Sequence, residues 1–188
     1  MGLLITGMVV WCAVHLFPAA LPSSRNGLVE RLGANAYRGL FALVILASLA
    51  AIVFGWKTAP QRAVYSPPLL GSPLPSGLVY IGIILFMAAQ FPTNIKRFLR
   101  HPQLTGVVIW GIAHLLTNGE QRSVLLFGGL ALWALVQIVL TNRRDGSWKK
   151  PVPAALKSDL ITVTIGTAVF AAFFVLHPWL FGVAAVSR

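Results

Sequence analysis

Six long apolar runs separated by short polar stretches constrain this chain more than any other feature of its sequence. The runs cover approximately residues 3–21, 39–56, 77–92, 104–118, 123–141 and 160–176. A membrane-spanning helix needs about 20 apolar residues, or about 17 if it stands upright, so the third and fourth runs are short. We predict an all-α fold in which residues 1–188 form one polytopic transmembrane bundle of six helices.

The composition supports a membrane protein rather than a soluble domain. Hydrophobic residues make up 57% of the chain and charged residues only 10%, whereas soluble domains carry about 25% charged residues. The formal net charge of +11 would suit nucleic-acid binding, but the lysines and arginines form short clusters between the apolar runs and never a continuous stripe. We therefore expect a lipid bilayer as the partner and no nucleic acid.

The basic residues also predict how the chain is oriented. Most lie on one side of the predicted bundle, within residues 25–38, 96–100 and 143–157. The other side carries only Lys57, Arg62, Arg122 and Arg188. Loops rich in lysine and arginine stay in the cytoplasm, so we expect both termini on the periplasmic side of a bacterial inner (cytoplasmic) membrane.

Acidic residues are scarce and lie outside the apolar runs. The chain has only Glu30, Glu120, Asp145 and Asp159. Di-iron carboxylate centres, acid pairs of the glycosidase type and many proton-coupled transporters need carboxylates inside the bundle, so the sequence disfavours these functions. Cys12 is the only cysteine, which excludes an intramolecular disulfide and indicates a packing role.

Two histidines lie inside apolar runs and share a local pattern. Each histidine has a tryptophan four residues before it, Trp11 for His15 and Trp110 for His114. Each also has a small residue three residues before it, Cys12 or Gly111. Residues three and four apart share a helix face, and a small residue there leaves room for a flat macrocycle. Two buried histidines from different helices are suitable axial ligands for haem b. The alternative is that each imidazole only donates to a backbone carbonyl on another helix.

A second pair of histidines precedes prolines. His101-Pro102 and His177-Pro178 begin two similar heptads, and proline favours the first turn of a helix. One interpretation is helix punctuation at the membrane interface. The other interpretation is functional. His101, together with Arg97 and Arg100, would contact the haem propionates, or it would be a ligand to the iron in another redox state.

The longest predicted loop is rich in proline, with Pro60, Pro67, Pro68, Pro73 and Pro75. It is either an exposed linker or a lid or partner surface.

The segment from Pro92 to Gly119, PTNIKRFLRHPQLTGVVIWGIAHLLTNG, with LLFGGL after it, resembles the core of the NnrU family. The first run with His15, the YRGL segment at Tyr37 and the closing HPWLFG at His177 extend the resemblance across nearly the whole chain. The combination of Arg-His-Pro-Gln with Trp-x-x-Ala-His is fairly specific.

The resemblance implies a bacterial membrane protein associated with nitrite and nitric oxide reduction and related to the plant zeta-carotene isomerase, a haem b enzyme. That enzyme's haem ligands correspond by resemblance to His15 and His114. The plant enzyme has a cysteine where this chain has Gly111, so ligation by a thiolate at that position is not implied.

Three functions follow as expectations. The first is a haem b protein, with isomerisation of a cis double bond in a long apolar polyene as its activity. The second is a haem-bearing or structural accessory protein that acts with denitrification proteins. The third is a transporter-like or structural membrane protein without haem.

Overall fold

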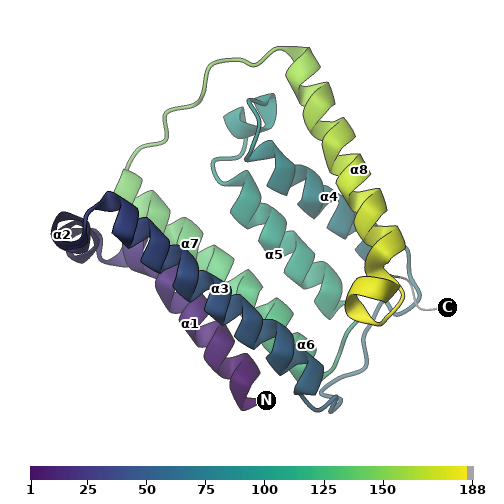
Figure 1. Cartoon of the computed structure of the whole chain (residues 1–188). Coiled ribbons are helices and arrows are strands. Elements are labelled where there is room, and N and C mark those ends of the chain that lie inside the picture. Colours follow the sequence, from purple (N-terminus) through teal and green to yellow (C-terminus); the bar gives the residue numbers. More distant parts are fainter. Residues whose placement is uncertain (186–188) are drawn as a thin grey trace.

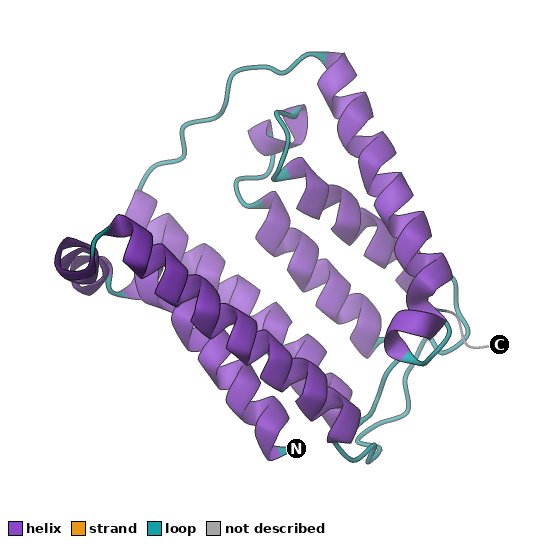
Figure 2. Ribbon diagram, viewed as in Figure 1, coloured by secondary structure: helices purple, strands orange, loops and turns teal. Residues whose placement is uncertain are grey.

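The computed structural model describes residues 1–185, and these form helices without a β-strand (Figure 2). The first half contains α1 (Gly2–Ala20), α2 (Pro22–Leu32), α3 (Ala34–Thr58) and α4 (Leu74–Ala88). A short 3-10 turn, η1 (Asn94–Arg97), precedes α5 (Pro102–Leu115). The next helix runs without a break through α6 (Gln121–Ser123), a π-helical turn η2 (Val124–Gly128) and α7 (Gly129–Asp145), and α8 (Leu156–Phe181) follows.

The long helices pack as neighbours in two groups of three. In the first group α1 packs against both α3 and α7, and in the second group α4 packs against both α5 and α8. The contact between α5 and α7 joins the two groups. Figure 1 shows α1, α3 and α7 side by side and α8 on the far side of α4 from them. Thus α7 lies between the helix that carries His15 and the helix that carries His114.

Helix length supports only part of the predicted span count. Within residues 1–185, four helices are long and apolar enough to cross a membrane, namely Gly2–Ala20, Ala34–Thr58, Gln121–Asp145 and Leu156–Phe181. Helix α4 is apolar but has 15 residues, about 22 Å at 1.5 Å per residue, and α5 has 14. All six predicted runs fall on helices, and six crossings remain a prediction.

Several helix boundaries differ from the prediction. Helix α4 ends at Ala88 rather than continuing to Pro92, because the chain turns there before η1. Helix α8 begins before residue 160 and continues through Pro178 to Phe181, so His177-Pro178 does not mark a helix boundary. In contrast, His101 is the N-cap of α5 and Pro102 is its first residue, as the punctuation hypothesis requires.

Helix α2 was not predicted, because its sequence PSSRNGLVERL is polar and begins like a loop. Proline suits the first position of a helix, and Pro22 here begins a new helix directly after α1. Figure 1 shows α2 end-on, whereas α1 and α3 are seen from the side. Helix α2 therefore lies crosswise at one end of the first group.

Apolar side chains cover the outside of the bundle. Leu43, Leu132 and Val175 are 64%, 63% and 62% exposed, whereas the buried core is small and centred on Leu4 and Met8. A soluble monomer rarely exposes so much contiguous apolar surface. The fold therefore matches a lipid environment.

Glycines allow α4 and α5 to approach closely. A Cβ on Gly82 would lie 2.9 Å from the carbonyl oxygen of Gly106, and a Cβ on Gly106 would lie 2.5 Å from that of Gly82. Small residues at membrane helix interfaces permit this approach where lipid gives no hydrophobic drive for association. Gly82 and Gly106 therefore serve the packing of α4 against α5.

The basic loops gather at one end of the molecule. Helix α2, η1 and the segment between α7 and α8 lie at the end opposite the N-terminus (Figure 1). The end of α8 lies at the same end as the N-terminus. This arrangement agrees with the predicted separation of charge, although Arg188 lies outside the described residues. The side of the membrane that each end faces remains a prediction.

Candidate functional site

His15 lies in an aromatic cluster formed by α1, α3 and α7. Its Nδ1 donates to the carbonyl oxygen of Trp11 at 2.9 Å, and the ring centroids of His15 and Trp11 are 4.1 Å apart. Trp133 from α7 and Phe41 from α3 meet the His15 ring edge-on, with centroid distances of 5.3 Å and 6.0 Å. Because a carbonyl can only accept, Nδ1 carries the proton, and Nε2 of the neutral ring keeps its lone pair.

The two tryptophan rings that contact His15 carry polar atoms without partners. The indole nitrogens of Trp11 and Trp133 are buried and have no hydrogen-bond partner among residues 1–185. The same holds for the Tyr37 hydroxyl, whose ring lies 6.2 Å from Phe41, and for Oε1 of Gln137, one turn after Trp133. Buried polar groups are normally paired, so these groups are free to pair with a ligand.

His114 has the same backbone arrangement on α5. Its Nδ1 donates to the carbonyl oxygen of Trp110 at 2.9 Å, which again leaves Nε2 available. The ring stacks on Phe127 at a centroid distance of 4.4 Å, and Trp110 meets Phe127 edge-on at 5.0 Å. Both predicted histidines thus have the tautomer that a metal ligand binding through Nε2 requires.

Phe127 was not identified from the sequence. It lies in the π-helical turn η2, and such turns frequently occur at functional sites. The extra residue in this turn presents Phe127 to His114, Trp110 and Trp56 together. No sequence pattern predicts a π-helical turn here.

Gly111 faces α7. A Cβ at this position would lie 2.7 Å from the Phe127 carbonyl oxygen and 3.0 Å from Cβ of Ala131. The space that the sequence pattern suggested for a macrocycle is therefore occupied by the neighbouring helix. Gly111 serves the close approach of α5 and α7.

The structure does not show His15 and His114 on a common ligand. His15 contacts Trp133 and His114 contacts Phe127, and no aromatic ring in the described part of the chain contacts both. These neighbours are six residues apart on one helix, about 9 Å along its axis. The two imidazoles therefore lie at different depths beside α7.

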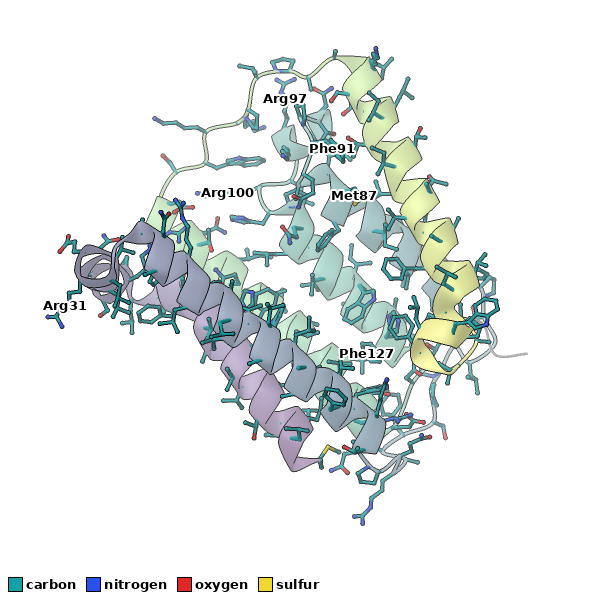
Figure 3. All side chains as sticks on the ribbon, viewed as in Figure 1. Arg31, Met87, Phe91, Arg97, Arg100 and Phe127 are labelled. Atoms are coloured by element: carbon teal, nitrogen blue, oxygen red, sulfur yellow. The ribbon has the colours of Figure 1, made fainter. Side chains whose placement is uncertain are left out.

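The residues expected near haem propionates lie at the basic end. Arg100 donates to the Gly146 carbonyl oxygen at 2.8 Å, and the His101 Nε2 lies 2.9 Å from Oδ1 of Asn142. Nε of Arg97 is buried without a partner in residues 1–185. Figure 3 shows Arg97 and Arg100 at the upper end, far from Phe127. His101 and Arg100 connect the start of α5 with the end of α7.

His177 lies near the opposite end, in α8. Its Nδ1 donates to the Val183 carbonyl oxygen at 2.7 Å, and its ring centroid lies 4.8 Å from that of Phe181.

The proline-rich loop folds back on the end of α5. Val64 donates to the Gly119 carbonyl oxygen at 2.8 Å, and the Tyr65 hydroxyl donates to the carbonyl oxygens of Leu115 and Asn118. Leu69 donates to the Leu116 carbonyl oxygen at 3.1 Å. The loop is thus a cap on the turn after His114 and not a free linker.

Comparison with known proteins gives one match. Residues 3–185 match the family described as NnrU protein. No curated protein and no solved structure matches the chain. The match covers nearly the whole sequence and confirms the resemblance seen in the Pro92–Gly119 segment, so the chain belongs to the NnrU family.

Proposed function

We propose that this NnrU-family protein binds haem b in the bacterial inner membrane through Nε2 of His15 and of His114. The single observation that carries the proposal is that both rings donate Nδ1 to the carbonyl four residues earlier, which leaves Nε2 free inside an apolar bundle. Neutral imidazole with its other nitrogen held by a backbone carbonyl is a well-oriented metal ligand.

The surroundings of His15 fit a haem. The group is a largely apolar disc with two carboxylates, and the cluster around His15 offers aromatic rings together with unpaired donors on Trp11 and Trp133. Unpaired buried donors cost free energy, which a bound acceptor would recover. The fit at His114 is narrower, since Phe127 covers one face of its ring. We therefore assign His15 as the ligand on which binding depends and His114 as the second ligand. Because the two imidazoles lie at different depths beside α7, ligation of one iron by both requires α5 to shift relative to α1 when haem binds.

Chemistry at such a site would come from the cofactor. Haem supplies redox and electrophilic chemistry when bound, while the chain offers no acid–base pair near either histidine. Glu30 lies in α2, Glu120 precedes α6, Asp145 ends α7 and Asp159 lies in the first turn of α8. The residues of the site would hold the cofactor and exclude water. This arrangement favours a haem protein over a transporter coupled to intramembrane carboxylates.

Cis–trans isomerisation of a long apolar polyene is the activity that we propose for testing. It needs no carboxylate, and the lipid-facing surface would admit an apolar substrate. Haem-loaded protein and a cis-polyene in detergent, analysed by chromatography of the extracted isomers, should give conversion that stops when His15 is replaced by alanine. Unchanged polyene with fully loaded protein would remove the isomerase proposal and leave haem binding intact.

Haem content tests the binding proposal. Protein purified from cells supplied with haem precursor should contain about one extractable haem b per chain. His15→Ala should lose most of it, and His177→Ala, which removes a histidine outside the proposed ligand pair, should keep it. Equal haem in wild type and His15→Ala would contradict the assignment. The accessory function predicts the same haem content but requires a co-purifying denitrification protein.

A further inference from the structure

Helix α2 borders two adjoining grooves between α1 and α3 that neither His15 nor His114 lines. The first, the apolar chamber, has about 330 Å³ and is lined by apolar side chains that include Phe17, Leu28, Leu40 and Val44. The second, the basic chamber, has about 340 Å³ and is lined by Pro18, Arg25, Tyr37, Arg38 and Phe41. Tyr37 and Phe41 line both, so the two chambers adjoin, and both are open to the outside of the protein.

The basic chamber has cations without protein counter-charges. Neither Arg25 nor Arg38 has a carboxylate partner within the described part of the chain. The Arg25 guanidinium lies 5.5 Å from the Tyr37 ring centre, and the Tyr37 hydroxyl is buried without a hydrogen-bond partner in residues 1–185. Two guanidinium groups and one free hydroxyl are donors suited to a phosphate.

The location suits a lipid. Short helices with basic and apolar faces lie in the plane of the membrane interface, and juxtamembrane arginines attract anionic lipids. Helix α2 contributes Leu28 and Leu32 to the apolar chamber and Arg25 to the basic one. Neither chamber is lined by His15, so the site is distinct from the proposed haem ligand.

We propose that this site binds one anionic phospholipid. Its phosphate lies between Arg25 and Arg38 and accepts a hydrogen bond from the Tyr37 hydroxyl, and one acyl chain occupies the apolar chamber beside Phe17 and Leu28. The charge of the basic chamber selects an anionic headgroup, and the lining of the apolar chamber selects a lipid over a small anion.

Mass spectrometry of the intact full-length protein released from detergent tests the proposal. Phosphatidylglycerol and phosphatidylcholine with the same acyl chains are added at equal concentration. Wild type should retain one phosphatidylglycerol at least about tenfold better than phosphatidylcholine, since each charge-assisted hydrogen bond to phosphate contributes substantially. The double variant Arg25→Gln/Arg38→Gln should lose this preference.

Arg31→Gln is the matched control. Arg31 also lies on α2, but it lines neither chamber, and Figure 3 shows it pointing away from the bundle. This variant should keep the wild-type preference. A drop in phosphatidylglycerol retention equal to that of the double variant would show general surface attraction and overturn the site.

Two further measurements separate the lipid from other ligands. Ala13→Phe fills the apolar chamber without changing charge and should reduce phosphatidylglycerol retention at least about fivefold. Inorganic phosphate alone, at millimolar concentration, should not displace the bound lipid. Displacement by phosphate would show that the site binds small anions rather than a lipid. Equal retention of both lipids by wild type would contradict the proposal.

Discussion

At the residue scale, the proposed ligand site depends on atoms that lack partners in the folded chain. Trp133 contacts His15 but leaves its indole N–H unpaired among residues 1–185. If an acceptor atom of the haem pairs with this N–H, Trp133→Phe should weaken haem binding about fivefold. This change in affinity corresponds to the loss of roughly one buried hydrogen bond. Stability of the haem-free protein should stay the same or rise. Haem titration followed by absorbance measures the first effect and thermal unfolding the second.

Trp179→Phe provides the comparison, because this tryptophan is 76% exposed and lies on α8. Its replacement should leave haem affinity unchanged. If Trp133→Phe also leaves affinity unchanged while lowering stability, the indole N–H serves only packing.

Gly111 permits a second prediction at this scale. An added Cβ would lie 2.7 Å from the Phe127 carbonyl oxygen, and the backbone of a packed helix can shift only slightly. Gly111→Ala should therefore destabilise the protein by about 1–3 kcal/mol, measured as unfolding in detergent. Gly77→Ala on α4, where nothing lies within 4 Å of the added Cβ, should be neutral or slightly stabilising. A stable Gly111→Ala that loses haem would instead make Gly111 part of the cofactor site.

At the element scale, a polar cluster holds the start of α8. It contacts only α4 and η1 substantially within the described chain. Asp159, in its first turn, accepts hydrogen bonds from the Thr93 hydroxyl at 2.6 Å and from the backbone and side-chain amides of Asn94 at 2.8 Å and 2.6 Å. These bonds anchor the start of α8 to η1.

Asp159→Asn would replace one of the two acceptor oxygens by an amide donor, so that one hydrogen bond to a donor of Thr93 or Asn94 is lost. We expect a lower free energy of unfolding, together with faster proteolysis in the segment before α8. Asp145→Asn should cost little, because Asp145 is 42% exposed and pairs with its neighbour Arg144. Equal effects of the two variants would contradict the anchoring role.

Hydropathy predicted the cores of the long helices because lipid-facing helices must be apolar throughout their length. It did not predict α2, since Pro22 and Ser23 resemble a loop, or η2, since a π-helical turn leaves no periodic signal. The anchor at Asp159 joins residues 65 apart, a separation that no local pattern encodes. Likewise the tryptophan–histidine pattern identified both candidate ligands, but their packing on different parts of α7 is a property of the tertiary fold.

At the scale of the whole molecule, the distribution of basic residues predicts the orientation in the membrane. With Cys12 replaced by alanine, Ser66→Cys in the proline-rich loop should react with a membrane-impermeant thiol reagent in spheroplasts. Ser147→Cys, between α7 and α8, should react only after the membrane is opened. Both positions are exposed, so access is decided by the side of the membrane. The reverse result would place both termini in the cytoplasm.

Ligation of one haem b by His15 and His114 would be visible in the absorption spectrum of the purified protein. Wild type should show a Soret band and, after reduction by dithionite, the sharp α and β bands of six-coordinate, low-spin haem. His15→Ala should lose the bands, and His114→Ala should lose the sharp reduced bands even where some haem remains. A colourless wild type expressed with added haem, or identical spectra from all three proteins, would contradict this ligation.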